Sequence, residues 1–206
     1  MRLETARLLL RPVVADDLES LVALDNDPEV MFFINAGAPT PRAEVEEDLQ
    51  WWPGYPDRYP AYGFYAAIEK ATGDFLGWFH LRPGEGAGPD EPELSYRLVR
   101  RAWGRGYASE GSRALVDAAF AELGATRVYA QTMAVNIASR RVMEKAGLRF
   151  VRTFVADWPV RIPGDEHGDV EYAITRAEWE SSRPLRGGEA DEVHLAEHEE
   201  QLGRPP

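Results

Sequence analysis

The segment LSYRLVRRAWGRGYASE, residues 94–110, decides the fold that we expect for this 206-residue chain. Its first part places apolar side chains at alternate positions, Leu94, Tyr96 and Leu98, which is typical of a strand. Residues 108–123 then carry apolar side chains at helical spacing, and two glycines, Gly104 and Gly106, lie between the two patterns. The segment therefore predicts a strand, a glycine loop and a helix.

The glycine loop is suited to a phosphate or pyrophosphate. Glycines let main-chain N–H groups converge without a Cβ in the way, and a helix N-terminus adds unpaired donors and the positive end of its dipole. A Rossmann turn would have a third glycine, where this chain has Ser109, and an acidic residue after the next strand, where it has Gln131 and Thr132. A Walker loop would need a Lys after the glycines. Both of these nucleotide-binding motifs therefore fit poorly.

The residues from Arg101 to Gly106 match the acyl-CoA signature Arg/Gln-x-x-Gly-x-Gly/Ala, and the chain resembles the GNAT acyltransferase superfamily that carries it. Residues 103–110, WGRGYASE, resemble its ribosomal-protein N-acetyltransferase (RimJ/RimL-type) branch. Residues 3–12 resemble the first strand of that family, and residues 136–150 resemble its second CoA-contacting helix. The resemblance covers about residues 1–180.

This resemblance implies an α/β fold with one mixed, mostly antiparallel sheet of six to seven strands, splayed between two central parallel strands and flanked by about four helices. The patterns along the chain predict helices at 16–26 and 136–146, with a further helix capped by Thr40 and carrying Pro41 at its first position. They predict strands at 7–11, 64–69, 75–81, 94–98, 127–133, 150–154 and 170–175. We expect one domain over residues 1–180 and an acidic, flexible tail over 181–206.

Composition limits the possible partners. A formal charge of −12 disfavours a nucleic-acid partner, and an apolar run long enough to span a membrane is missing from the sequence. The chain has no cysteine, so a thiolate nucleophile is excluded. His194 and His198 have the spacing of a helical metal pair but lack further ligands nearby, and we expect no metal. We expect a cytoplasmic protein, and the resemblance allows a homodimer.

The resemblance implies acetyl-CoA as co-substrate. Main-chain N–H groups from Arg101 to Ala108 would hold its pyrophosphate, with the Arg101 and Arg105 side chains as helpers. A main-chain N–H near Leu98 or Val99 would stabilise the developing oxyanion. The residues expected to bind the co-substrate are Leu98, Val99, Arg101, Trp103, Gly104, Arg105, Gly106, Tyr107, Ala108, Asn136 and Arg141.

Two residues are candidates for proton transfer. Glu93 enters the central strand where relatives often carry a catalytic carboxylate, although a glutamate at a strand entry can also be simply exposed. Glu110 competes as a base, but it also suits the first turn of a helix. Many superfamily members have a Tyr where this chain has Met143, which cannot donate a proton. Ser139, one turn earlier, is then the candidate general acid, unless its hydroxyl only bonds back to the helix.

Aromatic residues between positions 51 and 64 are candidates for the acceptor pocket: Trp51, Trp52, Tyr62 and Phe64. The alternative is that they fasten a proline-rich loop to the core. The expected activity is acetyl transfer from acetyl-CoA to a primary amine, either a peptide or protein N-terminus or a small amine, by direct attack in a ternary complex. The alternative function is a non-catalytic acyl-CoA-binding regulatory module.

Overall fold

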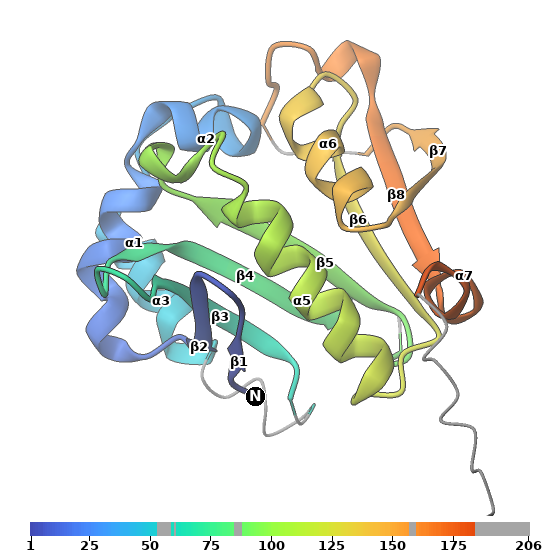
Figure 1. Ribbon diagram of the computed structural model, residues 1–206. Coiled ribbons are helices and arrows are strands. Elements are labelled where there is room, and N and C mark those ends of the chain that lie inside the picture. The colour runs from blue at the N-terminus through green and yellow to red at the C-terminus, as the bar shows by residue number, and fades with distance from the viewer. Residues whose placement is uncertain (53–58, 60, 85–87, 157–159, 184–206) are drawn as a thin grey trace, which may run out of the picture.

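The computed structural model describes residues 1–52, 59, 61–84, 88–156 and 160–183. The described residues form one mixed sheet in the order β1-β2-β3-β4-β5-β6-β8-β7, and β5 and β6 are its parallel pair (Figure 1). The strands are β1 (Leu3–Glu4), β2 (Leu8–Pro12), β3 (Gly63–Glu69), β4 (Phe75–Pro83), β5 (Pro92–Leu98), β6 (Arg127–Met133), β7 (Arg149–Phe154) and β8 (Asp169–Thr175). The sheet thus has eight strands, not six to seven. The additional strand, β1, is too short for an alternating pattern to show.

Helices number six in the described chain, against about four expected. They are α1 (Leu18–Asp25), α2 (Pro28–Asn35), α3 (Arg42–Trp51), α5 (Tyr107–Ala121), α6 (Ile137–Lys145) and α7 (Arg176–Ser182). The sequence reading missed α2 and α7, although both carry cap signals. At the start of α2, Asp27 is the N-cap before Pro28, and its side chain accepts a hydrogen bond from the Glu29 N–H. At the start of α7, Thr175 forms a capping box with Glu178.

The start of α3 also differs from the expectation. Pro41, not Thr40, occupies the N-cap position, and the helix begins at Arg42. The Thr40 hydroxyl is buried without a hydrogen-bond partner among the described residues. The expected cap failed because Pro41 has an extended backbone, with ψ at 137°, so it stays outside the helix.

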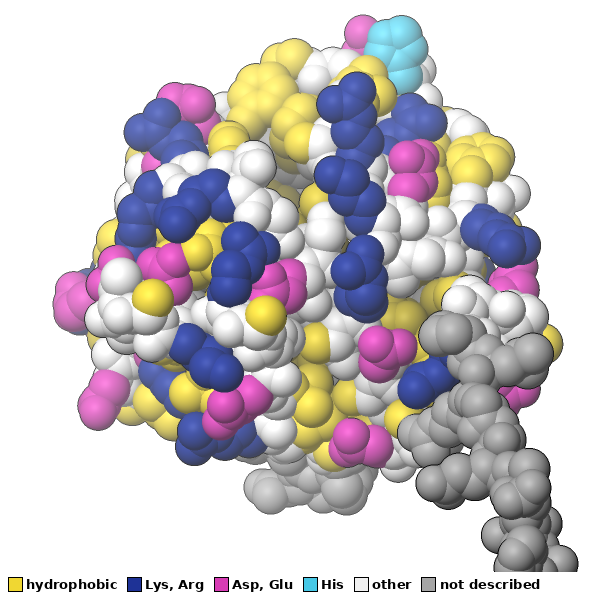
Figure 2. All heavy atoms as spheres, viewed as in Figure 1, with side chains coloured by type: hydrophobic (Ala, Val, Ile, Leu, Met, Phe, Trp, Pro, Cys, Tyr) yellow, Lys and Arg dark blue, Asp and Glu magenta, His cyan; other side chains and the backbone are white. Residues whose placement is uncertain are grey.

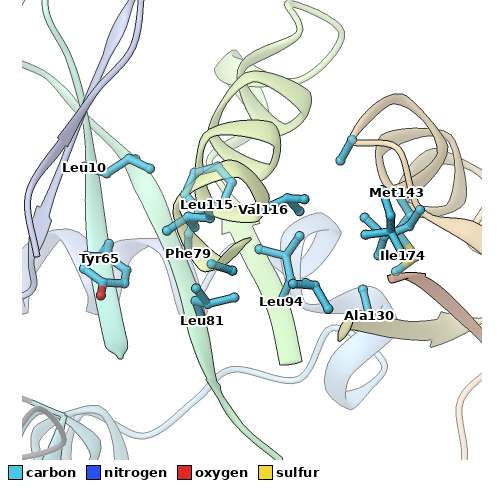
Figure 3. Packing of buried hydrophobic residues seen from close by; sticks show 14 of the residues in the cluster. Leu10, Tyr65, Phe79, Leu81, Leu94, Leu115, Val116, Ala130, Met143 and Ile174 are labelled. Atoms are coloured by element: carbon cyan, nitrogen blue, oxygen red, sulfur yellow. The ribbon is translucent and has the colours of Figure 1, made fainter. Parts of the chain in front are cut away.

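Two hydrophobic cores lie on opposite faces of the sheet. On one face α5 and α6 cover the sheet, and Phe79, Leu94 and Leu115 pack together there (Figure 3). A Cβ on Gly111 would lie 2.4 Å from the Phe79 ring, so glycine lets α5 approach β4 closely. On the other face α1 and α3 bury residues such as Leu21 and Val45.

Strands β5 and β6 separate after a single register pair, Glu93 with Tyr129. The splay expected between the central parallel strands is therefore present. The last described helix, α7, ends at Ser182, and the acidic tail with His194 and His198 lies outside the described residues. Within the described part of the chain, no helix is long and apolar enough to cross a membrane.

Candidate active site

A cavity of about 270 Å³ opens where β5 and β6 separate. Its wall combines the central strands with the first turns of α6, the end of α2 and the segment before β8. Residues that line it include Glu93, Tyr96, Gln131, Asn136, Ser139 and Val160. Both residues expected to move protons, Glu93 and Ser139, therefore lie in one cavity.

The glycine loop follows β5 and leads into α5. Gly104 and Gly106 have φ angles of +69° and +82°, which L-residues with a side chain rarely adopt. The Ala102 and Trp103 N–H groups donate to the carbonyls of Val99 and Arg100, but those from Gly104 to Ala108 donate to no acceptor in the described chain. A row of unpaired N–H groups at the start of a 15-residue helix fits a pyrophosphate.

Side chains of this loop are partly engaged by the protein itself. Arg101 donates to the Phe75 carbonyl at 3.0 Å, and Arg105 lies 3.5 Å from the Glu69 carboxylate. The Tyr107 hydroxyl also donates to Glu69. Backbone donors, rather than these two arginines, are therefore the readily available anion ligands in the loop.

Glu110 binds residues of the N-terminal segment and does not line the cavity. Its carboxylate accepts from the Thr5 hydroxyl at 2.6 Å and from the Arg7 N–H at 2.8 Å, which ties the segment before β2 to α5. The Arg7 side chain adds a bond to the same carboxylate. These bonds, made away from the cavity, favour the structural alternative over a role as base.

Leu98 and Val99 differ in what their main-chain groups offer. The Val99 N–H donates to the Leu76 carbonyl of β4 at 2.9 Å, so it is not available to an oxyanion. Successive N–H groups of a strand point to opposite edges, so the N–H groups of Leu98 and Tyr96 point toward the side where β6 has moved away. This corrects the expectation for Val99 and leaves Leu98. The Leu98 carbonyl accepts from the Trp103 indole N–H at 2.8 Å.

Glu93 lies against two basic side chains of β4. Its Oε2 is 3.8 Å from His80 Nε2 and 4.0 Å from the Arg82 guanidinium. Burial raises the pKa of the Glu93 carboxyl, but His80 and Arg82 together lower it by more, so the pKa lies below its ordinary value. Glu93 is therefore a carboxylate at neutral pH, as a base must be.

His80 is a residue that the sequence reading missed. It is buried between Phe64 and Trp78, and burial lowers its pKa below the ordinary value despite the nearby Glu93 carboxylate. Its Nδ1 accepts from Arg82 Nε at 3.5 Å, so the neutral ring carries its proton on Nε2, facing Glu93. Alternation along β4 and β5 could have suggested this neighbour, but the register of the two strands was needed to pair them.

Ser139 lies in the first turn of α6, where its N–H donates to the Asn136 side chain at 3.1 Å. Its hydroxyl is 2.9 Å from the hydroxyl of Tyr96, a second residue that the sequence reading missed. Tyr96 looked like one more apolar residue of the strand pattern. Met143 is buried beside Ile174 (Figure 3), and it also lines the cavity, where its thioether has no proton to donate.

The aromatic residues expected in the acceptor pocket do not line this cavity. Trp52 stacks on Phe64 with ring centres 4.2 Å apart, and both are buried in the core beneath α3. The Tyr62 hydroxyl donates to the Pro89 carbonyl at 2.6 Å. The sequence could not show that these rings face the sheet. Trp52, Tyr62 and Phe64 line a second cavity of about 190 Å³ instead, and Trp51 is about half exposed, so their role in acceptor selection stays a prediction.

Basic side chains gather on the face that α5 and α6 cover. Figure 2 shows Lys and Arg along α6 and near the start of α5, although the whole chain is acidic. Arg141 is exposed on α6, whereas Arg140 is held by the Ala134 carbonyl at 2.9 Å. A role for Arg141 in binding a phosphate stays a prediction. In the described residues no group of acidic or His side chains is arranged to hold a metal ion.

The profile of the Acetyltransferase (GNAT) domain matches residues 7–149, and the chain belongs to this family. An Aspergillus fumigatus protein, FsC-acetyl coenzyme A-N(2)-transacetylase, is 38% identical over 183 residues, which cover 86% of this chain and 77% of that protein. The chain is therefore an acetyltransferase that uses acetyl-CoA as co-substrate.

Two solved structures show the same fold. A GNAT-family acetyltransferase from Bacillus anthracis superposes with a TM-score of 0.72 at 23% identity. The superposition covers 86% of this chain and 99% of the B. anthracis chain. A spermidine N-acetyltransferase from Vibrio cholerae, in complex with CoA and spermine, superposes with a TM-score of 0.67 at 15% identity and covers 85% and 99%. At these identities the likeness extends to the fold alone.

Proposed function

We propose that this protein acetylates a primary amine, with Glu93 as the base and the amine attacking the acetyl group directly in a ternary complex. The observation that carries the proposal is that Glu93 and Ser139 line the same cavity, Glu93 from β5 and Ser139 from α6. The N(2) position in the name of the A. fumigatus relative supports an amine nitrogen as acceptor. The RimJ/RimL-type assignment remains part of the proposal and rests on residues 103–110.

The reaction needs one proton acceptor for the amine and one proton donor for the departing sulfur. The amine lone pair forms the C–N bond, the C–S bond breaks, and its electron pair stays on sulfur. The amine gives up one proton to Glu93, directly or through one water, and the sulfur takes one from the Ser139 hydroxyl. Glu93 then releases its proton to solvent, and Ser139 regains one from solvent. The products are an amide and a free thiol, and no covalent enzyme intermediate is needed.

An α-amine is the acceptor that suits this base best. At neutral pH an α-amine with a pKa near 8 is roughly 10% neutral, whereas a lysine amine is only about 0.04% neutral. Because its pKa is lowered, the Glu93 carboxylate is a weak base. An amine that is already partly neutral depends less on this base for its deprotonation. We therefore infer a peptide or protein N-terminus, or a small α-amine, rather than a lysine side chain.

The test is a panel of acceptors incubated with acetyl-CoA while free thiol is followed. The panel contains a peptide with a free N-terminus, the same peptide with a blocked N-terminus and an internal Lys, a free amino acid and a polyamine. We expect thiol release and acetylated product with at least one α-amine. If every acceptor leaves thiol release at the acceptor-free rate, the proposal is wrong.

The alternative of a non-catalytic acyl-CoA-binding module was motivated by the missing Tyr at position 143 and by the acidic tail. Tyr96 places a phenol hydroxyl beside Ser139, and this supports the catalytic proposal instead. Mass spectrometry of the protein after incubation with acetyl-CoA alone separates the mechanisms further. Direct attack leaves the mass of the protein unchanged, whereas an acetylated side chain would contradict it.

A further inference from the structure

Tyr96 and Ser139 form a pair of hydroxyl groups inside the cavity. Tyr96 comes from β5 and Ser139 from α6, and their oxygens lie 2.9 Å apart. The Tyr96 oxygen is also 3.1 Å from the main-chain carbonyl of Ser139. The phenol therefore has two possible acceptors on the same residue.

The two arrangements leave different groups facing the cavity. If Tyr96 donates to the Ser139 carbonyl, the serine hydroxyl donates to the tyrosine oxygen, and its hydrogen is used within the protein. If Tyr96 donates to Ser139 Oγ, the serine hydrogen is free to point into the cavity. Negative charge near Oγ favours the second arrangement, because a donor then faces the charge and the two hydrogen bonds reinforce each other.

Tyr96 has the properties that this role requires. Burial raises its pKa above the ordinary value, so the phenol keeps its hydrogen throughout the neutral range. The Asn136 side-chain oxygen already accepts from the Ser139 N–H, which holds the first turn of α6 in place. The Tyr96 ring packs near Phe79 with centres 5.9 Å apart, so the ring is fixed independently of its hydroxyl.

We propose that Tyr96 is a positioning residue that turns the Ser139 hydroxyl toward the sulfur of the departing thiol. This inference rests on the proposed function, because it requires the thioester to lie in the cavity between β5 and β6. Ser139 donates to the sulfur as the C–S bond breaks and its electron pair collects there, and Tyr96 donates to Ser139. The family position for a helix Tyr is filled here by Met143, so a hydroxyl from the strand takes over the support of the leaving group.

A titration of bound CoA tests this inference without turnover. The ultraviolet absorbance of the thiolate, followed against pH, gives the pKa of the bound thiol. We expect a value below that of free CoA in the wild-type protein, and a rise of about one unit in both Tyr96→Phe and Ser139→Ala. The double variant should show no further rise. Thr132→Val, which removes another hydroxyl from the cavity wall, is the matched control and should leave the value unchanged.

Turnover gives the second measurement. Tyr96→Phe should lower kcat about tenfold with KM for acetyl-CoA nearly unchanged, and should have no further effect in the Ser139→Ala background. Ser139→Thr, which keeps the hydroxyl, should retain sensitivity to Tyr96→Phe. Effects of Tyr96→Phe and Ser139→Ala that multiply would overturn the inference, as would a bound-thiol pKa that neither variant moves.

The two proposals fail in different ways. If no amine is acetylated, the proposed function is wrong, and the titration of bound CoA still decides whether Tyr96 acts through Ser139. If amines are acetylated but the thiol pKa is insensitive to both variants, the proposed function stands and the inference about Tyr96 is wrong.

Discussion

Strand β5 has one closed edge and one open edge. Toward β4 it stays in register from the Gly77/Leu98 pair to the Pro83/Pro92 pair, whereas toward β6 it shares only the Glu93/Tyr129 pair. The closed edge uses its N–H and C=O groups within the sheet, and the open edge leaves such groups for a ligand. One strand thus provides both a rigid support and a binding surface, and the following predictions test this difference.

The largest effect is expected at the closed edge, from Gly77→Ala. Gly77 has a φ of +133°, and a Cβ there would lie 2.1 Å from the Arg97 carbonyl oxygen of β5. Because the clash is with backbone, the two strands must separate, and we expect the free energy of unfolding to fall by about 3 kcal/mol or more. Chemical denaturation measures the loss.

Gly73→Ala is the matched control for that substitution. Gly73 also has a positive φ, +78°, but a Cβ there would meet no atom within 4 Å. We expect a loss of about 1 kcal/mol, from the backbone conformation alone. Equal losses at the two glycines would show that close packing of β4 on β5 does not hold this edge.

At the open edge, the largest effect is expected from Glu93→Gln. The amide keeps the shape of the side chain but cannot accept the proton of the amine, so kcat should fall about 100-fold. Initial rates with the best acceptor measure this change. Glu91→Gln, on a neighbouring carboxylate that pairs with Arg127, should leave kcat within about twofold. Comparable losses in both variants would mean that Glu93 is not the base.

The His80 imidazole should make stability depend on pH. Burial lowers its pKa in the folded protein, so below about pH 6.5 the unfolded chain binds a proton that the folded chain does not. Stability should therefore fall as the pH drops from about 6.5 toward the folded pKa, by up to about 1.4 kcal/mol per unit. The charged groups that face His80 are Glu93, Arg82 and Arg97.

His80→Gln removes this titration, and unfolding free energies measured between about pH 7 and 5.5 should then vary less with pH. Titration of Glu93 also lowers stability as the pH falls, but in a more acidic range, because its pKa in the folded protein lies below 4.5. A pH dependence that is identical in the wild-type protein and in His80→Gln would contradict a buried neutral imidazole.

The smallest effect is expected from Trp103→Phe. The indole N–H donates to the Leu98 carbonyl at the end of β5. In the described chain, this donor stands where a neighbouring strand would otherwise supply an N–H. Loss of one hydrogen bond should lower the free energy of unfolding by about 1 kcal/mol. Chemical denaturation at neutral pH measures it. An unchanged stability would mean that water replaces the indole at this open edge.

Much of the fold could be predicted from local patterns. The alternation at residues 94–98, the glycine pair and the helical spacing after it indicated the strand, loop and helix that the structure contains. Strands were predicted at residues 150–154 and 170–175, and they are present as β7 and β8, which pair antiparallel. Helix α2 was missed because its eight residues bury little besides Met31, so no apolar periodicity marked it.

The candidate site was harder to predict, because its residues come from separate elements. Ser139 was found through its helix, but Tyr96 and His80 were not found, since a strand pattern treats them only as inward-facing side chains. A main-chain N–H near Leu98 or Val99 was expected to serve the oxyanion, and only the pairing of Val99 with Leu76 shows that the Val99 N–H is occupied.

The sequence by itself determined the glycine loop and the helix after it, because backbone conformation at glycines and apolar spacing are local properties. It also determined that no cysteine could carry an acetyl group. Only the tertiary structure decided which side chains meet. The register of β4 on β5 places His80 near Glu93, and the packing of α6 across the open edge places Ser139 against Tyr96. Such contacts depend on distances between elements, and no local pattern encodes them.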